Sequence, residues 1–127
     1  MTNPYSVYTK NMENVTTKED LLLKVYEKIL SHLNIAKFAI EEEDIKTKAE
    51  SIAKVTDAIA VLKTSLDMEN GKEIAENLDK IYDFCLEELL RANLENNKER
   101  INNVIEIITP IYDGFKEAVK NLRTQNE

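Results

Sequence analysis

The sequence is poor in residues that interrupt helices, bind metals or cross-link chains. Its 127 residues include two glycines, two prolines, one cysteine, one histidine and no tryptophan. Two glycines and two prolines are too few for the many turns of an all-β fold, and this scarcity favours long helices. One cysteine excludes an internal disulfide. One histidine excludes the paired Glu-x-x-His ligands of a di-iron bundle, and no Cys/His set for zinc remains. We expect no metal and no cofactor.

Long apolar runs and clusters of basic residues are also missing. No stretch approaches the roughly 18 apolar residues that span a bilayer. The first five residues, MTNPY, lack the basic and apolar regions of a secretory signal. A net charge of −7 repels phosphate backbones. The chain has no glycine-rich phosphate loop and no Ser/His/Asp set. These absences predict a cytoplasmic protein that is not an enzyme, with no nucleic-acid partner, no direct membrane insertion and no small-molecule substrate.

The residues that are abundant predict a helical bundle. Hydrophobic residues make up 43% of the chain and charged residues 32%, and the apolar ones recur at helical spacing in four segments. These run from about Thr17 to Glu42, from Asp44 to Leu66, from Lys72 to Ala92, and over residues 101–122. Short connections between long helices favour antiparallel neighbours. The fold class predicted for residues 17–127 is an all-α, antiparallel up-down four-helix bundle in a single domain, preceded by an N-terminal arm, residues 1–16.

Local signals suggest where the helices begin and end. Residues 16–19, TTKE, resemble a capping box that starts the first helix. Asn70 and Gly71 separate the second and third helices, and Gly71 can adopt the left-handed conformation of a helix end. Pro110 falls inside the last helix, where it removes one backbone donor and is expected to introduce a kink.

The bundle has more apolar residues than its core faces require. Leu23, Leu30, Ile35 and Phe38 lie off the main stripe of the first segment, and Val61, Phe84 and Leu90 lie off those of the next two. A bundle helix needs one apolar face, so the additional side chains must be covered by something else. Two explanations are open, and both can hold: the N-terminal arm covers them, or a partner segment docks on them.

His32 and Cys85 are the two side chains that could carry chemistry. A lone histidine on a bundle helix can act in phosphotransfer, but the turn after His32, LNIA, lacks the lysine that would bind a phosphoryl group. Cys85 lies in an apolar stripe beside Phe84 and Leu86, where a thiol acts as a small hydrophobe. Both residues are predicted to be dispensable for function.

Several segments in order resemble one known family, the flagellar export chaperones called FliS. Residues 3–8, NPYSVY, are similar to its N-P-Y-x-x-Y start, and residues 19–27, EDLLLKVYE, to its E-E-L-I-x-M-L-Y-D. Residues 36–45, AKFAIEEEDI, follow its A-K-x-A-I-E-x-x-D-I. The most specific segment is 65–78, SLDMENGKEIAENL, which matches S-L-D-x-E-x-G-G-E-I-A-x-N-L. It is followed by YDF at residues 82–84 and AN at residues 92–93.

The chain departs from this pattern at a few positions. Lys24 replaces an apolar residue, and Lys28 and Lys72 replace glycines, the latter in the G-G pair. Phe115 stands where the family usually has tryptophan, and Pro110 is unusual in its last helix. These differences concern the groove and the last helix.

The resemblance implies a function and a set of partners. Members of this family bind the C-terminal segment of flagellin, which is disordered as a monomer, and so prevent premature polymerisation. They deliver it to the flagellar type III export gate without ATP. The third segment carries the most specific signal, so the second and third helices are expected to supply the flagellin-binding groove. Its candidate residues are Ile52, Val55, Ile59, Leu62, Leu78, Ile81 and Tyr82, some of which must belong to the core instead.

The arm is expected to act as a lid over apolar surface. Tyr5, Val7 and Tyr8 are its candidate residues, since Tyr5 and Tyr8 would share one face of a helical turn. Two other functions stay open from the residues alone. One is a phosphotransfer bundle centred on His32, and the other is a bundle that associates with its own copy.

Overall fold

The computed structural model describes residues 17–125, which form four helices and contain no strand. The helices are α2 (Lys18–Glu41), α3 (Ile45–Thr64), α4 (Met68–Glu95) and α5 (Lys98–Gln125). The all-α prediction is confirmed, and the four predicted segments correspond to these helices in order. The arm and its residues Tyr5, Val7 and Tyr8 lie outside the described residues.

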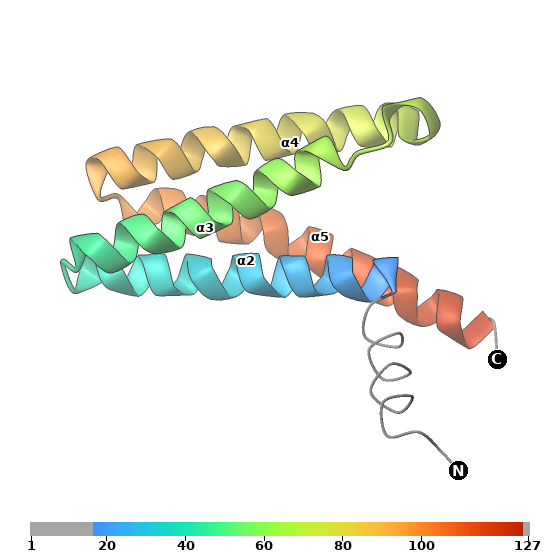
Figure 1. The fold of residues 1–127 in the computed structure, drawn as a ribbon, viewed down its shortest axis with the longest axis horizontal. Coiled ribbons are helices and arrows are strands. Elements are labelled where there is room, and N and C mark those ends of the chain that lie inside the picture. The colour runs from blue at the N-terminus through green and yellow to red at the C-terminus, as the bar shows by residue number, and fades with distance from the viewer. Residues whose placement is uncertain (1–16, 126–127) are drawn as a thin grey trace, which may run out of the picture.

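The helices form an up-down bundle in which each one packs against two others (Figure 1). Helix α2 contacts α3 and α5, and α4 contacts the same two helices. The connections after α2, α3 and α4 are only a few residues long, so successive helices run in opposite directions. As a result, α3 lies between α2 and α4, with one interhelical surface on each side.

Side-chain oxygens cap the first three described helices. In each case the residue before the helix accepts a hydrogen bond from the backbone N–H three residues later: Thr17 from Asp20 at 3.2 Å, Asp44 from Thr47 at 3.1 Å, and Asp67 from Asn70 at 3.0 Å. These bonds satisfy amide groups that have no partner within the helix. The predicted capping box was therefore displaced by one residue, because Thr17 is the N-cap of α2 and Asp20 occupies its N3 position.

The start of α4 differs from the prediction. Asn70 and Gly71 do not end the preceding helix; they belong to the first turn of α4, which begins at Met68. Lys72, rather than Gly71, has the positive φ, with φ 46° and ψ −121°. This backbone conformation matches the first central position of a type II′ turn, where glycine is favoured. The first turn of α4 is therefore set at an angle to the rest of the helix (Figure 1).

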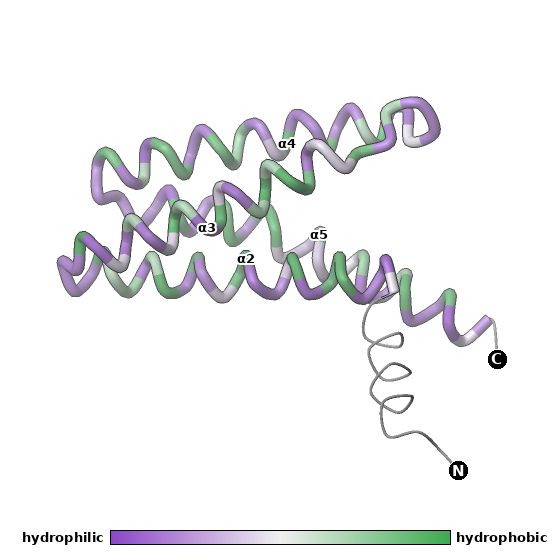
Figure 2. Tube along the Cα trace, in the orientation of Figure 1, coloured by the Kyte–Doolittle hydropathy of each residue, from purple (hydrophilic) through white to green (hydrophobic). Residues whose placement is uncertain are grey.

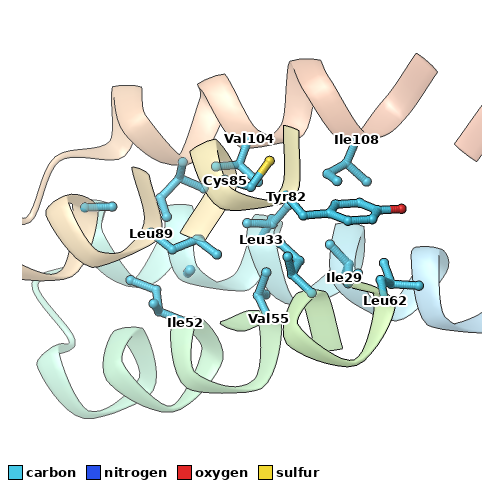
Figure 3. Packing of buried hydrophobic residues seen from close by; sticks show 14 of the residues in the cluster. Ile29, Leu33, Ile52, Val55, Leu62, Tyr82, Cys85, Leu89, Val104 and Ile108 are labelled. Atoms are coloured by element: carbon cyan, nitrogen blue, oxygen red, sulfur yellow. The ribbon is translucent and has the colours of Figure 1, made fainter. Parts of the chain in front are cut away.

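One contiguous core fills the space between the four helices (Figure 3). Ile29 and Leu33 of α2, Val55 of α3, and Cys85 of α4 have no exposed surface in it. The remaining buried members of this cluster are Tyr26, Ala36, Ile52, Ile59, Leu62, Tyr82, Leu89, Ala92, Ile101, Val104 and Ile108. Aliphatic side chains from every helix interdigitate here, so the core depends on all four helices at once.

Buried polar groups are paired with one another. The hydroxyl oxygens of Tyr26 and Tyr82 lie 2.7 Å apart and share a hydrogen bond across the core. The buried Glu88 carboxylate accepts hydrogen bonds from Arg100 at 2.9 Å and Asn103 at 3.0 Å, which join α4 to α5. No buried side-chain nitrogen or oxygen of residues 17–125 lacks a partner.

A buried lysine closes the end of the bundle where α4 meets α5. The Lys48 amine of α3 donates to the backbone carbonyl of Asn93 at 2.9 Å and to the side-chain oxygen of Asn96. Asn96 is in the left-handed conformation, with φ 52°, and ends α4. Helix α4 therefore continues to Glu95, three residues past its predicted end at Ala92. At the other predicted irregularity, Pro110, α5 runs on without interruption to Gln125.

Loss of one hydroxyl from the Tyr26–Tyr82 pair is predicted to cost more than loss of both. Burial raises the pKa of both tyrosines, so the shared bond joins two protonated hydroxyls. Tyr82→Phe leaves the Tyr26 hydroxyl buried without a partner and should lower the free energy of unfolding by about 1–3 kcal/mol. Tyr26→Phe/Tyr82→Phe should be more stable than either single variant. Urea denaturation of all four proteins tests this, and additive losses would contradict it.

Lys72→Gly is predicted to stabilise the protein. Glycine adopts the backbone conformation of Lys72 without strain, so the free energy of unfolding should rise by about 1 kcal/mol. Lys80→Gly is the matched control, because Lys80 is an exposed residue inside the same helix. There glycine should lower the free energy of unfolding by about 1 kcal/mol. If urea denaturation shows that both variants change the free energy of unfolding in the same direction, the assignment of strain to Lys72 is refuted.

Candidate functional site

The surface of the bundle carries many large apolar side chains. Figure 2 shows apolar residues recurring along all four helices. The ones that are exposed are Leu21, Ile35, Phe38, Ile45, Val61, Met68, Ile74, Phe84, Leu90, Leu94 and Leu122. Apolar side chains exposed in groups, with hollows between them, are typical of surfaces that bind other polypeptides. Two such groups lie on either side of α3.

The first group lines the α2/α3 groove, defined by two hollows: one where the second half of α2 meets the start of α3, and one between the two helices. One hollow of about 580 Å³ is lined by Ser31, Asn34, Ile35, Phe38, Ala39, Glu42, Asp44 and Thr47. The next, of about 290 Å³, is lined by Lys28, Ile29, His32, Lys54, Asp57 and Ala58. Phe38 is 62% exposed at the first hollow, and Val61 of α3 is 58% exposed one turn beyond Asp57. The larger hollow therefore combines the apolar Ile35 and Phe38 with the acidic Glu42 and Asp44, and the smaller one is lined mainly by ionisable residues.

The second group lines the α3/α4 groove, a hollow of about 240 Å³. Its walls are Ala49, Ile52, Ala53, Thr56 and Asp57 of α3, and Leu86, Leu89, Leu90 and Asn93 of α4. Ala49 and Ala53 have small side chains and so leave space between the two helices, and Leu90 is 56% exposed at the rim of this hollow. Asp57 borders both this hollow and the smaller hollow of the α2/α3 groove, so it lies on α3 between them.

Most of the seven candidate groove residues are buried in the core, and the others are partly buried at its edge. Five of them are buried core residues that present almost no surface to a partner: Ile52, Val55, Ile59, Leu62 and Tyr82. Leu78 and Ile81 are partly buried and pack against that core. Of the seven, Ile52 forms part of the floor of the α3/α4 groove. The reason is geometric, because these residues form the inward stripes of α3 and α4 that hold the bundle together.

Residues off the stripes form the exposed surface instead. Ile35, Phe38, Val61, Phe84 and Leu90 were predicted to lie outside the core faces, and all five are exposed. Leu23 and Leu30, predicted with them, are half-buried. Three of these five residues, Ile35, Phe38 and Leu90, also line the hollows beside α3.

Some stripe residues are exposed because they lie near helix ends. Leu21, Ile45, Ile74 and Leu122 continue the apolar stripes in the sequence but are exposed in the structure. Each lies in the first or last turns of its helix, or just after the break at Lys72, where fewer neighbours pack against it. Periodicity alone does not show where the neighbouring helix ends.

His32 and Cys85 have different surroundings. Burial, Lys54 and Lys28 together lower the pKa of His32, which is half-buried in the smaller hollow of the α2/α3 groove. The lysine missing from the turn after His32 is thus supplied one turn earlier and by the neighbouring helix. Cys85 is fully buried, as predicted, and burial with the nearby Glu88 charge raises the pKa of its thiol to about 12.

Residues 17–125 contain no cluster of three or more His, Cys, Asp or Glu side chains that could hold a metal ion. No helix in this range is both long and apolar enough to cross a membrane.

The fold and surface define a small all-α bundle with apolar grooves between its helices. Comparison with known proteins places it more narrowly. The family described as "Flagellar protein FliS" matches residues 1–122. The chain therefore belongs to the FliS family.

Individual relatives agree with this assignment. The chain is 35% identical over 60 residues to the "Flagellar secretion chaperone FliS" of Bacillus subtilis (strain 168), a match that spans 47% of this chain and 45% of the relative. A solved structure described as "Crystal structure of flagellar chaperone from bacteria" has the same fold, with a TM-score of 0.76 and 15% identity. That similarity covers 94% of this chain and 99% of the other.

Cys85 is predicted to resist alkylation in the folded protein. A thiol pKa of about 12, against an ordinary value of 9.0, lowers the thiolate fraction near pH 8 about a thousandfold. Iodoacetamide should label native protein at least about a hundredfold more slowly than protein in urea. Because folding raises the pKa of this thiol, its contribution to the free energy of unfolding is complete below pH 9. That contribution falls as the pH rises toward 12, where the unfolded chain loses the proton and the folded one keeps it. Native labelling as fast as in urea would contradict this.

Proposed function

We propose that this protein is an export chaperone that binds the C-terminal segment of flagellin in the cytoplasm. It holds the segment in an unassembled form, prevents premature polymerisation and delivers flagellin to the flagellar type III export gate. Membership of the FliS family supports this, together with similarity to proteins described as flagellar chaperones.

The observation that carries the proposal is the pair of apolar grooves that flank α3. Large side chains stand exposed at both, including Phe38 on the α2 side and Leu90 on the α4 side. A segment that is disordered when free loses conformational entropy on binding, so it must bury substantial apolar surface to bind at all. Full burial of one large apolar side chain contributes about 1.5–3 kcal/mol. Several such contacts in two grooves can offset the ordering of a peptide.

Holding a segment in this way requires no catalysis. The grooves present apolar surface with a few charged groups, and the Cys85 thiol is buried away from them. Flagellin would leave the chaperone by handover to the export gate, as competing contacts replace the groove contacts.

We further propose that the N-terminal arm serves as a lid through Tyr5, Val7 and Tyr8. Exposed apolar side chains of the bundle favour association in water unless something covers them. The arm offers two tyrosines and a valine, and a tyrosine ring can lie on an apolar surface while its hydroxyl stays in water. A flagellin segment would then compete with the arm for the same surface.

Single substitutions in each groove test the flagellin contact. Phe38→Ser and Leu90→Ser remove one exposed apolar side chain each, and should weaken binding of a flagellin C-terminal peptide by about five- to thirtyfold in isothermal titration. Leu122→Ser is the matched control, because Leu122 is also exposed but lies near the end of α5 and lines neither groove. Its affinity should stay within about twofold of the parent.

Three results would contradict the proposal. The parent protein could fail to bind the peptide, or both groove variants could bind as tightly as Leu122→Ser. Light scattering could also show that the free protein forms a stable dimer that the peptide does not dissociate. That last result would favour self-association as the role of the grooves. Unchanged circular dichroism of each variant ensures that a loss of binding reports the contact and not the fold.

A further inference from the structure

The smaller hollow of the α2/α3 groove is surrounded by basic side chains. Lys28 and His32 lie one turn apart on α2, and Lys54 faces them from α3. Asp57 is the one acidic residue in the lining, and Ile29 and Ala58 supply its apolar part. Among the described residues, α5 also packs against α2 but contributes nothing to this hollow. A chain with a net charge of −7 therefore has a local excess of positive charge here.

The two lysines of the hollow take no part in the ion pairs of residues 17–125. Neither Lys28 nor Lys54 forms an ion pair with any carboxylate of residues 17–125. Some other basic residues do form ion pairs: the Lys63 amine lies 3.0 Å from a carboxylate oxygen of Asp79, and the Arg91 guanidinium lies 2.8 Å from one of Glu87. Asp57 also lies beyond ion-pair distance from both lysines, although it borders the same space. An incoming negative charge would meet unpaired ammonium groups.

The size of the hollow limits what it can accept. Its volume of about 290 Å³ lies at the lower end of the range of ligand pockets, which is roughly 300–1,000 Å³. A carboxylate or a phosphate group fits in such a space, whereas a nucleotide would fill or exceed it. The lining provides two ammonium groups and an imidazole as hydrogen-bond donors.

We propose that the hollow formed by Lys28, His32 and Lys54 is a binding site for a small oxyanion, a phosphate or a carboxylate. The two lysines attract the anion, and His32 donates a further hydrogen bond to it when protonated. This site does not depend on the proposed flagellin contact, since it can take a free anion in the absence of any polypeptide.

Binding at this site is coupled to protonation of His32. In the free protein, burial and the charges of Lys54 and Lys28 hold the pKa of His32 below its ordinary value. A bound anion offsets those charges and favours the imidazolium form, so the pKa of His32 rises on binding. By linkage, the anion binds more tightly as the pH falls through the titration range of His32. Asp57 lines the same hollow and its negative charge repels the anion, so its removal strengthens anion binding.

His32 provides the measurement, because it is the only histidine in the chain. Its ring proton resonances can be titrated with pH by NMR in sodium phosphate, sodium acetate and sodium chloride at equal ionic strength. Phosphate or acetate should raise the pKa of His32 above its value in chloride and should do so saturably. A larger effect of phosphate identifies a phosphate site, and a larger effect of acetate identifies a carboxylate site. Coincident titrations in all three salts would overturn the proposal.

Charge variants separate a defined site from general screening. Lys54→Gln and Lys28→Gln should each weaken anion binding by about three- to fivefold, the effect of removing one exposed charge. Asp57→Asn should strengthen it by a similar factor. Lys120→Gln is the matched control, since it removes the same charge from exposed α5 surface outside the hollow, and it should bind as the parent does. Equal weakening in Lys120→Gln and Lys54→Gln would show a non-specific charge effect and overturn the proposal.

Discussion

Each helix of this bundle can bury only one face, and the rest of the structure depends on that constraint. The inward faces are completed by aliphatic side chains such as Ile29, Val55 and Ile108, which have no exposed surface. Any further apolar residue must lie outside, however much it favours burial. Phe38, Val61 and Leu90 are such residues. The grooves beside α3 are therefore a consequence of a sequence that has more apolar residues than a four-helix core can enclose.

The position of α3 gives these grooves their form. This helix is the shortest of the four and contacts both α2 and α4. Small and apolar residues predominate on its α4 side, with Asp57 at the edge, whereas Lys54 and Asp57 line its α2 side. The two surfaces are chemically different although they share one helix. A polypeptide bound on both sides would meet an almost uncharged groove and a groove with a basic centre.

The helices and their order were accessible from the sequence because periodicity, caps and connection lengths agreed. Asp44, for example, was placed at the start of a helix and is its N-cap. The groove was accessible only in part. Ile59 and Phe38 are both apolar residues at helical positions, and what separates them is which face meets a neighbour. The off-stripe positions indicated which apolar residues are exposed. The candidates chosen because they lie in or beside the most specific family motif, such as Ile59, are mostly buried in the core. The basic hollow was not predicted, because Lys54 is distant from His32 along the chain and near it only across two helices.

The break at Lys72 also has a consequence for how α4 comes apart. Helix formation is cooperative only along an unbroken run of helical residues, because each added residue extends an existing hydrogen-bonded turn. A non-helical residue at position 72 separates the turn that begins at Met68 from the long segment that follows. Fraying of that first turn therefore stops at the break and does not spread toward Tyr82. The first turn of α4 and the segment after Lys72 are therefore two separate units of local unfolding. Amide hydrogen exchange would show weaker protection in the first turn than in the segment that follows.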